Sequence, residues 1–476
     1  MDETICAIAT PVGEGGIGIV RLSGDRAIPI ASYLVRLRSG KPLSAAKSFL
    51  LHYADLVEPA GSETVPGPAS QESASPFDES LVVVMRAPRS YTREDVVELH
   101  CHGGPLILKR VCQGLLRCGA RLAQPGEFTK RAFLNGRLDL AQAEAVLDTI
   151  RAKTEAALTV AQTQLRGSLS TQAYALRDRL IALLAEVEAG IDFVEEDLRF
   201  VGREALASGL RDAERLVTRW LATAEQGRVL REGMTTAIIG RPNVGKSSLL
   251  NALVQTDRAI VTPIPGTTRD VLEEYVNVRG IPLRLLDTAG LRETEDPVEQ
   301  EGVRRTRTAI DRAELVLLVL DSSQPPHADD LALLDQLAGT RGILVLNKSD
   351  LPRQLHESVL PPSRQGSHAG TLPIVDVSAL TGQGLDELRS AIWTLATGSP
   401  LEPTDMAAIT RLRHEDALSR VRQALRQAQE SVTAQAPQEC VALDLRQAID
   451  GLEELTGAVT TDEILDRIFS EFCIGK

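Results

Sequence analysis

Eight residues near the middle of the chain combine two glycines, a lysine and a hydroxyl in a spacing that suits phosphate binding. The segment Gly240-Arg-Pro-Asn-Val-Gly-Lys-Ser247 follows an apolar run over 235–239 and precedes a helical pattern over 247–254. In such a strand–loop–helix context, backbone N–H groups and the helix N-terminus face an anion. We expect Lys246 to reach the β- and γ-phosphates and Ser247 to ligate Mg²⁺. The alternative is an ordinary Gly/Pro loop before a core helix, and the motifs that follow make this alternative less favoured.

Two further motifs stand downstream in the order that a nucleotide-dependent switch requires. Gly266-Thr-Thr-Arg-Asp270 offers Thr268 as a second Mg²⁺ ligand, and Asp287-Thr-Ala-Gly290 ends an apolar run, where it can sense the γ-phosphate. Leu291 follows it, whereas Ras-like proteins have a glutamine there that orients the attacking water. Hydrolysis therefore needs another group to position water and another positive charge to offset the developing negative charge.

The base-recognition motifs come last and select guanine. Asn347-Lys348-Ser-Asp350 ends another apolar run, and the Asp350 carboxylate can accept both the ring N–H and the exocyclic amine of guanine, which adenine does not offer. Ser378 and Ala379 complete the base pocket. We expect GTP to contact Asn243, Val244, Gly245, Lys246, Ser247, Ser248, Thr268, Asp287, Thr288, Ala289, Gly290, Asn347, Lys348, Asp350, Ser378 and Ala379. Asn243 has two interpretations of equal weight, a ligand of a monovalent cation or a side chain that stabilises the turn.

Length and composition indicate a multidomain globular protein. The 476 residues suffice for roughly three domains at about 150 residues each, and 43% are hydrophobic. The net charge of −13 does not favour nucleic-acid binding, so any RNA must meet a local basic patch or a partner's surface. The six cysteines have no paired spacing, which disfavours zinc and disulfides. No targeting peptide is visible and the longest apolar run, 315–320, is too short to span a membrane, so we expect a cytoplasmic protein.

Changes in periodicity divide the chain. Short apolar runs in residues 1–122 predict an α+β domain. We expect strands at 17–22, 48–53, 81–85 and 96–100, a helix at 105–116 and a surface loop at 58–80. Helical stripes fill 123–230 and return after residue 404. The simplest arrangement is one split helical domain, 123–230 and 398–476, interrupted by an inserted α/β G domain at 231–397. The expected fold class is thus multidomain: a P-loop, Ras-like G domain inserted into a helical domain and preceded by an α+β domain.

Motifs along the whole length resemble one family. They comprise 9–21 near the start, His102-Gly-Gly-Pro105, Pro125-Gly-Glu-Phe-Thr-Lys-Arg-Ala-Phe-Leu-Asn135, the features Asn243, Gly266–Asp270 and Leu291 described above, and Phe472-Cys-Ile-Gly-Lys476 at the end. With these features the chain resembles the MnmE (TrmE) family of tRNA-modifying GTPases. The domain order is also similar, with a folate-binding N-terminal domain first.

The resemblance implies a cation-dependent mechanism for GTP hydrolysis. Asn243 together with Thr262, Ile264 and Thr267 matches the potassium site, and Thr262 and Thr267 also belong to the GTP contacts. K⁺ would provide the charge of an arginine finger while two G domains meet face to face. Glu299 matches the glutamate that positions water, although from the residues alone it reads as a solvated acid. Arg292 resembles a switch residue of the same step. Lys246, Glu299, Arg292 and Cys473 are thus the expected catalytic residues.

The resemblance further implies a folate site in the N-terminal domain. Arg21, Glu98 and Arg137 match positions that bind a 5-formyl- or 5,10-methylene-tetrahydrofolate, and the terminal Lys476 contributes. A carboxylate suits the donor edge of a pterin and an arginine suits an anionic group. From the residues alone, Glu98 reads instead as a solvent-facing strand residue. Val12 and Glu14 stand where some family members have Pro and Arg, so the charge of that loop differs.

Cys473 allows three interpretations: a buried small hydrophobe, a poorly matching prenylation box, or a cysteine that takes part in modification as the family resemblance implies.

Two functions remain open at this point. The first is a homodimeric, K⁺-dependent GTPase that associates through its N-terminal and G domains. With an FAD-containing partner of the MnmG (GidA) type, in a heterotetramer or larger assembly, it would use a folate one-carbon unit to modify C5 of the wobble uridine of tRNA by aminomethyl or carboxymethylaminomethyl addition. The second is a ribosome-assembly or signalling GTPase resembling Era and Der, with no modifying chemistry.

Overall fold

The computed structural model describes residues 3–11, 13–59, 75–192, 202–256, 274–286, 307–337, 339–355, 372–398 and 409–476. The chain divides into two compact units. The first holds Met1–Leu147 and Thr456–Lys476, and the second holds the described residues from Asp148 to Leu455. The expected domain limits at residues 122, 230 and 397 concern finer divisions and remain predictions.

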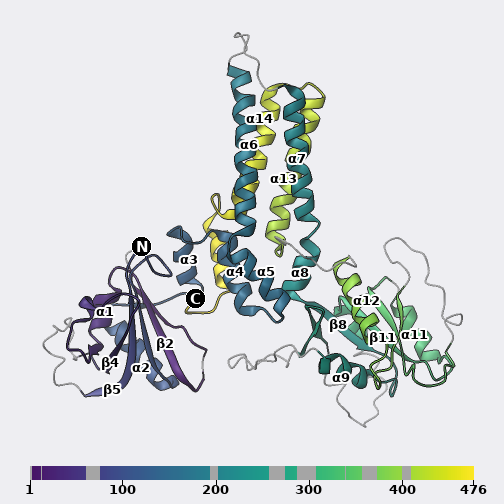
Figure 1. The fold of residues 1–476 in the computed structure, drawn as a ribbon, viewed down its shortest axis with the longest axis horizontal. Coiled ribbons are helices and arrows are strands. Elements are labelled where there is room, and N and C mark those ends of the chain that lie inside the picture. Colours follow the sequence, from purple (N-terminus) through teal and green to yellow (C-terminus); the bar gives the residue numbers. More distant parts are fainter. Residues whose placement is uncertain are drawn as a thin grey trace. The chain divides into compact units, whose positions relative to one another are not determined.

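The first unit is built on a seven-stranded sheet in the order β3-β4-β5-β6-β2-β1-β7. Helices α1 and α2 cover one face, where alternate residues such as Val20, Val82 and Leu99 are buried (Figure 1). The elements are β1 (Ile5–Ile8), β2 (Gly15–Ser23), α1 (Ala27–Ser32), β3 (Val35–Leu37), a 3₁₀ turn (Leu43–Ala45), β4 (Leu51–Val57), β5 (Pro76–Met85), β6 (Val96–Gly103), α2 (Pro105–Arg117), β7 (Arg121–Leu122), α3 (Glu127–Leu134), α4 (Leu140–Arg151, which continues into the second unit) and α15 (Asp462–Ser470).

Most elements expected in this unit are confirmed, but the strand expected at 48–53 runs over Leu51–Val57 and the strand expected at 81–85 begins at Pro76. The strand expected at 48–53 begins only at Leu51, because Phe49 has a φ of 61° that interrupts an extended backbone. The loop expected at 58–80 ends too late, because Pro76–Ser80 already belong to β5 and pair with β4. Within that loop, 60–74 lie outside the described residues.

A buried ionic network fixes α3 against the sheet. The Glu127 carboxylate accepts hydrogen bonds from Arg121 at 2.6 Å and Arg131 at 2.9 Å, and from the backbone N–H of Gln124 at 2.8 Å. Arg131 is 1% exposed and also donates to Glu94 at 3.0 Å. Since every charge in the network has a partner, burial of the group is tolerated.

The second unit contains a six-stranded sheet in the order β13-β12-β11-β8-β10-β9, in which only β9 runs antiparallel. Both faces of the central strands are buried, one against α9 and α12 and the other against α11. Its elements are β8 (Met234–Ile239), α9 (Lys246–Thr256), β9 (Glu274–Val278), β10 (Ile281–Leu285), β11 (Leu315–Asp321), α11 (Ala328–Gln336), β12 (Gly342–Asn347), β13 (Ile374–Asp376) and α12 (Leu385–Thr397).

The helices of this unit come from both sides of the sheet region in sequence, which confirms the expectation of an interrupted helical segment. Helices α6, α7, α13 and α14 lie alongside one another (Figure 1). Trp220 of α7 donates to Gln172 of α6 at 3.1 Å, and Arg426 of α13 donates to Glu214 of α7 at 2.6 Å. The helices are α5 (Glu155–Leu165), α6 (Ser168–Asp192), α7 (Arg203–Leu221), α8 (Ala224–Glu232), α13 (Leu412–Thr433) and α14 (Gln438–Thr456).

One carboxylate joins the chain segments on either side of the sheet. Asp148 is 8% exposed, and its Oδ1 accepts from Arg231 Nε at 2.9 Å and from Arg411 Nη2 at 2.7 Å. Arg231 precedes β8 and Arg411 precedes α13. The sheet region therefore begins and ends at neighbouring points, as an inserted domain requires.

The Glu127 network predicts an acid-sensitive first unit. Its hydrogen-bond partners outweigh burial and lower the pKa of Glu127 from 4.5 to about 2. A lowered folded-state pKa means that the stabilisation is present above pH 4.5 and is lost as the pH falls toward 2. Glu127→Gln should therefore lower stability at pH 7 by up to about 3 kcal/mol, the equivalent of that shift. The difference from wild type should vanish near pH 2.

Calorimetric unfolding of the full chain at a series of pH values measures this effect. Glu3→Gln is the matched control, because Glu3 also pairs with Arg121 but its side chain is 71% exposed. A loss of stability for Glu127→Gln that does not vary with pH would contradict the ionic origin of the effect.

Candidate nucleotide site and a second polar cluster

The phosphate-binding candidate is a loop between β8 and α9. Gly240 has a φ of 146° and Gly245 a φ of 96°, values that favour glycine. A Cβ on Gly245 would lie 2.2 Å from Asn347 Nδ2, and one on Gly240 would lie 2.3 Å from the Val319 carbonyl oxygen. Both glycines are therefore required for the loop to approach the strands behind it. The sequence-predicted strand, loop and helix are all confirmed.

Lys246 lies folded over this loop. Its Nζ donates to the carbonyl oxygens of Gly240 at 2.9 Å and Arg241 at 2.7 Å. Burial lowers the pKa of Lys246, because a desolvated ammonium group loses hydration. Arg241 is held elsewhere, since its Nε donates to the buried carboxylate of Asp330 at 2.8 Å. Among the described residues, Lys246 is thus the loop cation whose hydrogen-bond partners are backbone carbonyls, those of Gly240 and Arg241.

Asn347 connects the phosphate loop to the base-recognition motifs. Its Nδ2 donates to the Val244 carbonyl oxygen at 2.9 Å, and its Oδ1 accepts from the backbone N–H of Ala379 at 3.1 Å. Ser378 Oγ donates to Asp350 Oδ1 at 2.6 Å, which orients the carboxylate expected to read guanine. The structure therefore brings together the residues that sequence assigned to three separate motifs.

One residue at this edge escaped the sequence analysis. Asp321 ends β11, is 4% exposed, and accepts from Lys348 Nζ at 2.6 Å. Burial alone would raise the pKa of Asp321, but hydrogen bonds from Lys348 and Ser323 outweigh it and lower the pKa. A carboxylate directly after an all-apolar strand was the available signal. Its pairing holds Lys348, which has a φ of 63°, in place beside Asn347.

Asn243 lies exposed in the loop with a φ of 63°, a conformation that asparagine tolerates better than most residues. This favours a role in the turn and is compatible with a role as ligand. The remaining switch and cation residues lie outside the described residues: Thr262, Ile264, Thr267, Thr268, Asp287, Thr288, Ala289, Gly290, Leu291, Arg292 and Glu299. Ser247 and Ser248 lie in the first turn of α9.

A second polar cluster lies in the first unit and contains the residues assigned to folate. Arg21 of β2 stands directly opposite Glu98 of β6, and its Nε donates to Glu98 Oε1 at 2.8 Å. The Glu98 side chain is only 17% exposed, so the reading of Glu98 as a solvent-facing residue is wrong. Arg21 Nη1 also donates to the Gly475 carbonyl oxygen at 3.5 Å. Burial, and then the charge of Arg21, lower the pKa of Lys476.

Tyr91 links this cluster to Arg137. The guanidinium of Arg21 lies 5.7 Å from the Tyr91 ring centroid, and that of Arg137 lies 4.7 Å from it. Arg137 also donates to the Tyr91 carbonyl oxygen at 2.9 Å. The ring of Phe128 lies 5.7 Å from Arg21. Tyr91 was not predicted from the sequence. Its position among the arginines of 86–93 was the signal that could have indicated it.

Cys473 is exposed, so the reading of it as a buried hydrophobe is wrong. Its carbonyl oxygen accepts from the Gly126 N–H at 3.4 Å, which places the segment 473–476 against the start of α3. A Cβ on Gly475, whose φ is 100°, would lie 2.4 Å from the Ile8 carbonyl oxygen. The tail is therefore packed closely enough to bring Lys476 to Arg21.

The geometry of Asp350 predicts a change of base preference on mutation. Asp350→Asn should weaken GDP binding about 100-fold or more, because two hydrogen bonds to a charged acceptor are lost at about 1.5–3 kcal/mol each. Xanthosine diphosphate should bind better to the variant than GDP, since the asparagine amide can donate to the carbonyl that replaces the guanine amine.

Fluorescence titration with labelled nucleotides measures both affinities. Asp386→Asn is the control, because this 83% exposed carboxylate of α12 changes the net charge equally. Unchanged GDP affinity in Asp350→Asn would remove Asp350 from the base site.

Comparisons with known proteins agree along the full length. Residues 4–137 match the model of the GTP-binding protein TrmE N-terminus, and 140–473 match the model of the MnmE helical domain. The tRNA modification GTPase MnmE of Geobacillus kaustophilus is 47% identical over 475 residues, covering 100% of this chain and 99% of the relative. That of Geobacter metallireducens is 48% identical over 477 residues and covers 100% of both. A solved structure of Aquifex aeolicus Era bound to GDP·AlF₄⁻ is 28% identical over 40% of this chain and 66% of that chain, with a TM-score of 0.25. The chain belongs to the MnmE family of tRNA modification GTPases.

Proposed function

We propose that this GTPase hydrolyses GTP in a K⁺-dependent manner as a homodimer. With an FAD-containing partner of the MnmG type, it modifies C5 of the wobble uridine of tRNA from a tetrahydrofolate one-carbon unit. The observation that carries the proposal is the meeting of Arg21, Glu98 and Lys476, residues far apart in sequence, around one partly buried cluster. In the same unit, the guanidinium of Arg137 lies over the ring of Tyr91, which Arg21 also contacts.

The nucleotide half of the proposal rests on the edge of the second sheet. The phosphate loop and Lys246 would hold the β- and γ-phosphates, and Ser247 with Thr268 would hold Mg²⁺, which neutralises charge on the phosphates when bound. Asp350, oriented by Ser378, would read guanine. Because Asn347 hydrogen-bonds to the phosphate loop and to Ala379, base binding and phosphate binding act on one connected structure.

The hydrolytic step needs more than these residues. Leu291 has no polar atom to orient water, so Glu299 would position water and Arg292 would assist. Asn243, exposed in the loop, would hold K⁺ together with Thr262, Ile264 and Thr267. A bound K⁺ supplies positive charge against the transition state. A second G domain would close over this site.

The donor set of the second cluster fits a reduced folate. The Glu98 carboxylate can accept from the N–H groups of a pterin, while Arg21 and Arg137 offer charge and guanidinium planes. Lys476 is partly buried, which lowers its pKa, and its ammonium group lies close enough to Arg21 and Glu98 to attract a carbonyl or carboxylate of a ligand there. Cys473 is exposed beside this cluster, where a thiol could take part in modification.

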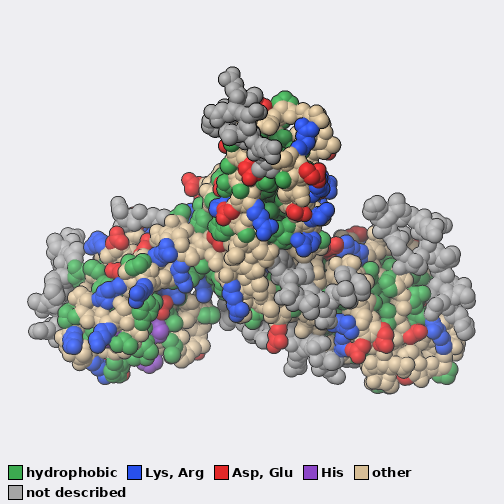
Figure 2. Space-filling model, turned by 45° about the horizontal axis from the view of Figure 1, so that its top comes forward, with side chains coloured by type: hydrophobic (Ala, Val, Ile, Leu, Met, Phe, Trp, Pro, Cys, Tyr) green, Lys and Arg blue, Asp and Glu red, His purple; other side chains and the backbone are tan. Residues whose placement is uncertain are grey.

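The open face of the first sheet supports homodimerisation through the N-terminal domain. Four large apolar residues, Ile17, Leu51, Tyr53 and Leu81, are 64%, 57%, 46% and 39% exposed on β2, β4 and β5. Figure 2 shows hydrophobic side chains next to Lys and Arg on the surface of this unit. Large apolar side chains exposed on one sheet are a feature of interaction sites. A second copy of this chain is the partner we propose for it.

The rival function, an Era- or Der-like GTPase without modifying chemistry, would need a basic RNA-binding module. The match of residues 4–137 to the TrmE N-terminus argues against it. No helix in the described part of the chain is long and apolar enough to cross a membrane. We propose a cytoplasmic location, where tRNA and folate are available.

The cation mechanism predicts a salt-specific GTPase. The hydrolysis rate should fall at least about tenfold when NaCl replaces KCl at equal ionic strength, since a comparable charge from an arginine is worth about 10³ or more elsewhere. Glu299→Ala should reduce turnover in KCl while leaving GDP affinity unchanged. The rate per chain should rise with protein concentration if two G domains must meet.

Phosphate release assays provide all three readouts. Equal and fast rates in both salts, or a rate per chain independent of dilution, would contradict the mechanism. Full turnover in Glu299→Ala would remove only the role assigned to that residue.

The folate assignment predicts that Glu98→Gln abolishes modification. The variant should bind 5-formyl-tetrahydrofolate at least about tenfold more weakly, because hydrogen bonds to a charged group contribute about 1.5–3 kcal/mol. In a strain lacking the gene, wild type should restore the modified wobble uridine and Glu98→Gln should not. Calorimetry and the nucleoside profile of tRNA are the measurements.

Glu79→Gln is the matched control, a 55% exposed carboxylate on the neighbouring strand β5. It should bind folate and restore modification like wild type. If the deletion strain shows an unchanged nucleoside profile, the rival function is favoured.

A further inference from the structure

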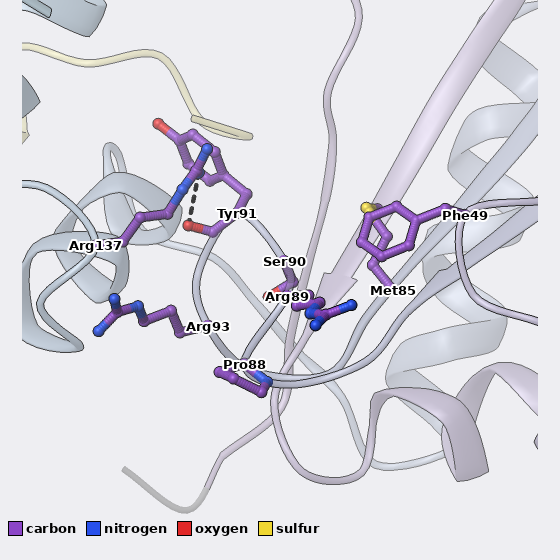
Figure 3. A pocket seen from close by; sticks show the side chains of 8 residues that line it. All are labelled: Phe49, Met85, Pro88, Arg89, Ser90, Tyr91, Arg93 and Arg137. Carbon is purple, nitrogen blue, oxygen red and sulfur yellow. Dashed lines mark hydrogen bonds between the residues drawn. The ribbon is translucent and has the colours of Figure 1, made fainter. Parts of the chain in front are cut away.

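A hollow of ≈ 500 Å³ opens at one end of the first sheet. Its walls come from the last residue of β5 and the loop that follows it, from Phe49 two residues before β4, and from Arg137 beyond α3 (Figure 3). Phe49 and Met85 line one side, and Tyr91 and Arg137 line the other. The complete lining is Phe49, Met85, Pro88, Arg89, Ser90, Tyr91, Arg93 and Arg137.

Three of the lining residues are arginines, and no ion pair joins any of them to an acidic residue within the described ranges. Arg93 donates to the Asn135 carbonyl oxygen at 2.9 Å, and Arg137 donates to that of Tyr91 at 2.9 Å (Figure 3). Carbonyl acceptors orient a guanidinium without neutralising it. Elsewhere in this unit, Arg117 and Arg121 each pair with a carboxylate. In a chain with a net charge of −13, the hollow is a local basic site.

Aromatic surface accompanies the charge. The Phe49 side chain is 58% exposed, and its backbone is held at a φ of 61° by an N–H that donates to the Val84 carbonyl oxygen at 3.0 Å. The guanidinium of Arg137 lies over the ring of Tyr91. An exposed ring beside unpaired arginines is the combination by which proteins hold single-stranded nucleic acid, with bases stacking on rings and phosphates meeting guanidinium groups.

We infer that this hollow docks the single-stranded anticodon loop of the tRNA substrate. Phosphates of the loop contact Arg89 and Arg93, and a base stacks on Phe49. The position is chemically consistent, because Tyr91 also contacts Arg21, so RNA in the hollow lies beside the polar cluster of this unit. The inference rests on the part of the proposed function that places the modification at the wobble uridine, and it does not require the folate proposal to be correct.

The test is binding of a fluorescent anticodon stem–loop RNA with uridine at the wobble position to the full-length protein, at several salt concentrations. For single strands each phosphate contact contributes about 0.7 to the slope of log affinity against log salt, or about fivefold in affinity at 0.1 M. Arg89→Ala and Arg93→Ala should each reduce the slope and the affinity by about these amounts. Phe49→Leu should lower affinity about fivefold or more without changing the slope.

Controls separate docking from charge and from folding. Arg117→Ala removes one exposed positive charge from the same unit, where it is paired with Glu58, and should leave slope and affinity unchanged. Arg89→Lys with Arg93→Lys should retain most of the slope, and thermal unfolding should match wild type for all variants.

Wild-type slope and affinity in the Arg89→Ala, Arg93→Ala double variant would overturn the inference. A second outcome would also overturn it. If the double variant keeps its RNA affinity but no longer binds folate triglutamate more tightly than folate monoglutamate, the hollow binds the glutamate tail of folate instead of RNA. Neither result would affect monoglutamate folate binding at Glu98, which tests the proposed function separately.

Discussion

The insertion of the nucleotide-binding region depends on one buried carboxylate. Asp148 receives Arg231 from the chain entering the sheet and Arg411 from the chain leaving it. A buried charge with two partners holds its geometry firmly, since the loss of a partner leaves an uncompensated charge at a cost of about 3–5 kcal/mol. The two ends of the sheet region therefore stay fixed to the helices.

The nucleotide site of the same unit is also held by side chains that connect separate segments of the chain. Asn347 binds the phosphate loop with its amide nitrogen and the base loop with its oxygen, so one side chain sets the separation of two loops. Asp321 accepts a hydrogen bond from Lys348, and Asp330 accepts one from Arg241, so both cations are already paired with carboxylates. The loop cation left to meet phosphate is Lys246.

The sequence predicted local features well and long-range pairings poorly. The strand, glycine loop and helix around 240–247 follow from neighbouring residues, so periodicity and glycine spacing sufficed. The pairing of Arg21 with Glu98 depends on the register of β2 against β6, which separates them by 77 positions and is invisible to local patterns. Asp148, Asp321 and Tyr91 were missed for the same reason. Their partners lie in other elements, and only the packed sheet and bundle bring them together.

The strand limits failed where backbone conformation overrode composition. Phe49 is apolar and reads as strand, yet its left-handed φ ends the extended segment and turns the ring outward. Pro76 reads as loop, yet it begins β5, a position that a strand tolerates because its first residue need not donate a hydrogen bond. Phe49 lines the hollow, so the error at this strand limit falls at the surface used for the inference above.

The contact of Arg21 with Gly475 spans 454 positions and so imposes an order on biogenesis. The first strands can pair as soon as they leave the ribosome, but the polar cluster stays incomplete until the tail has also emerged, which at about 5–20 residues per second takes tens of seconds. A prematurely terminated chain would carry a folded sheet with an unfinished cluster. The cluster therefore takes its final form only after segment 473–476 has docked beside β2 and α3.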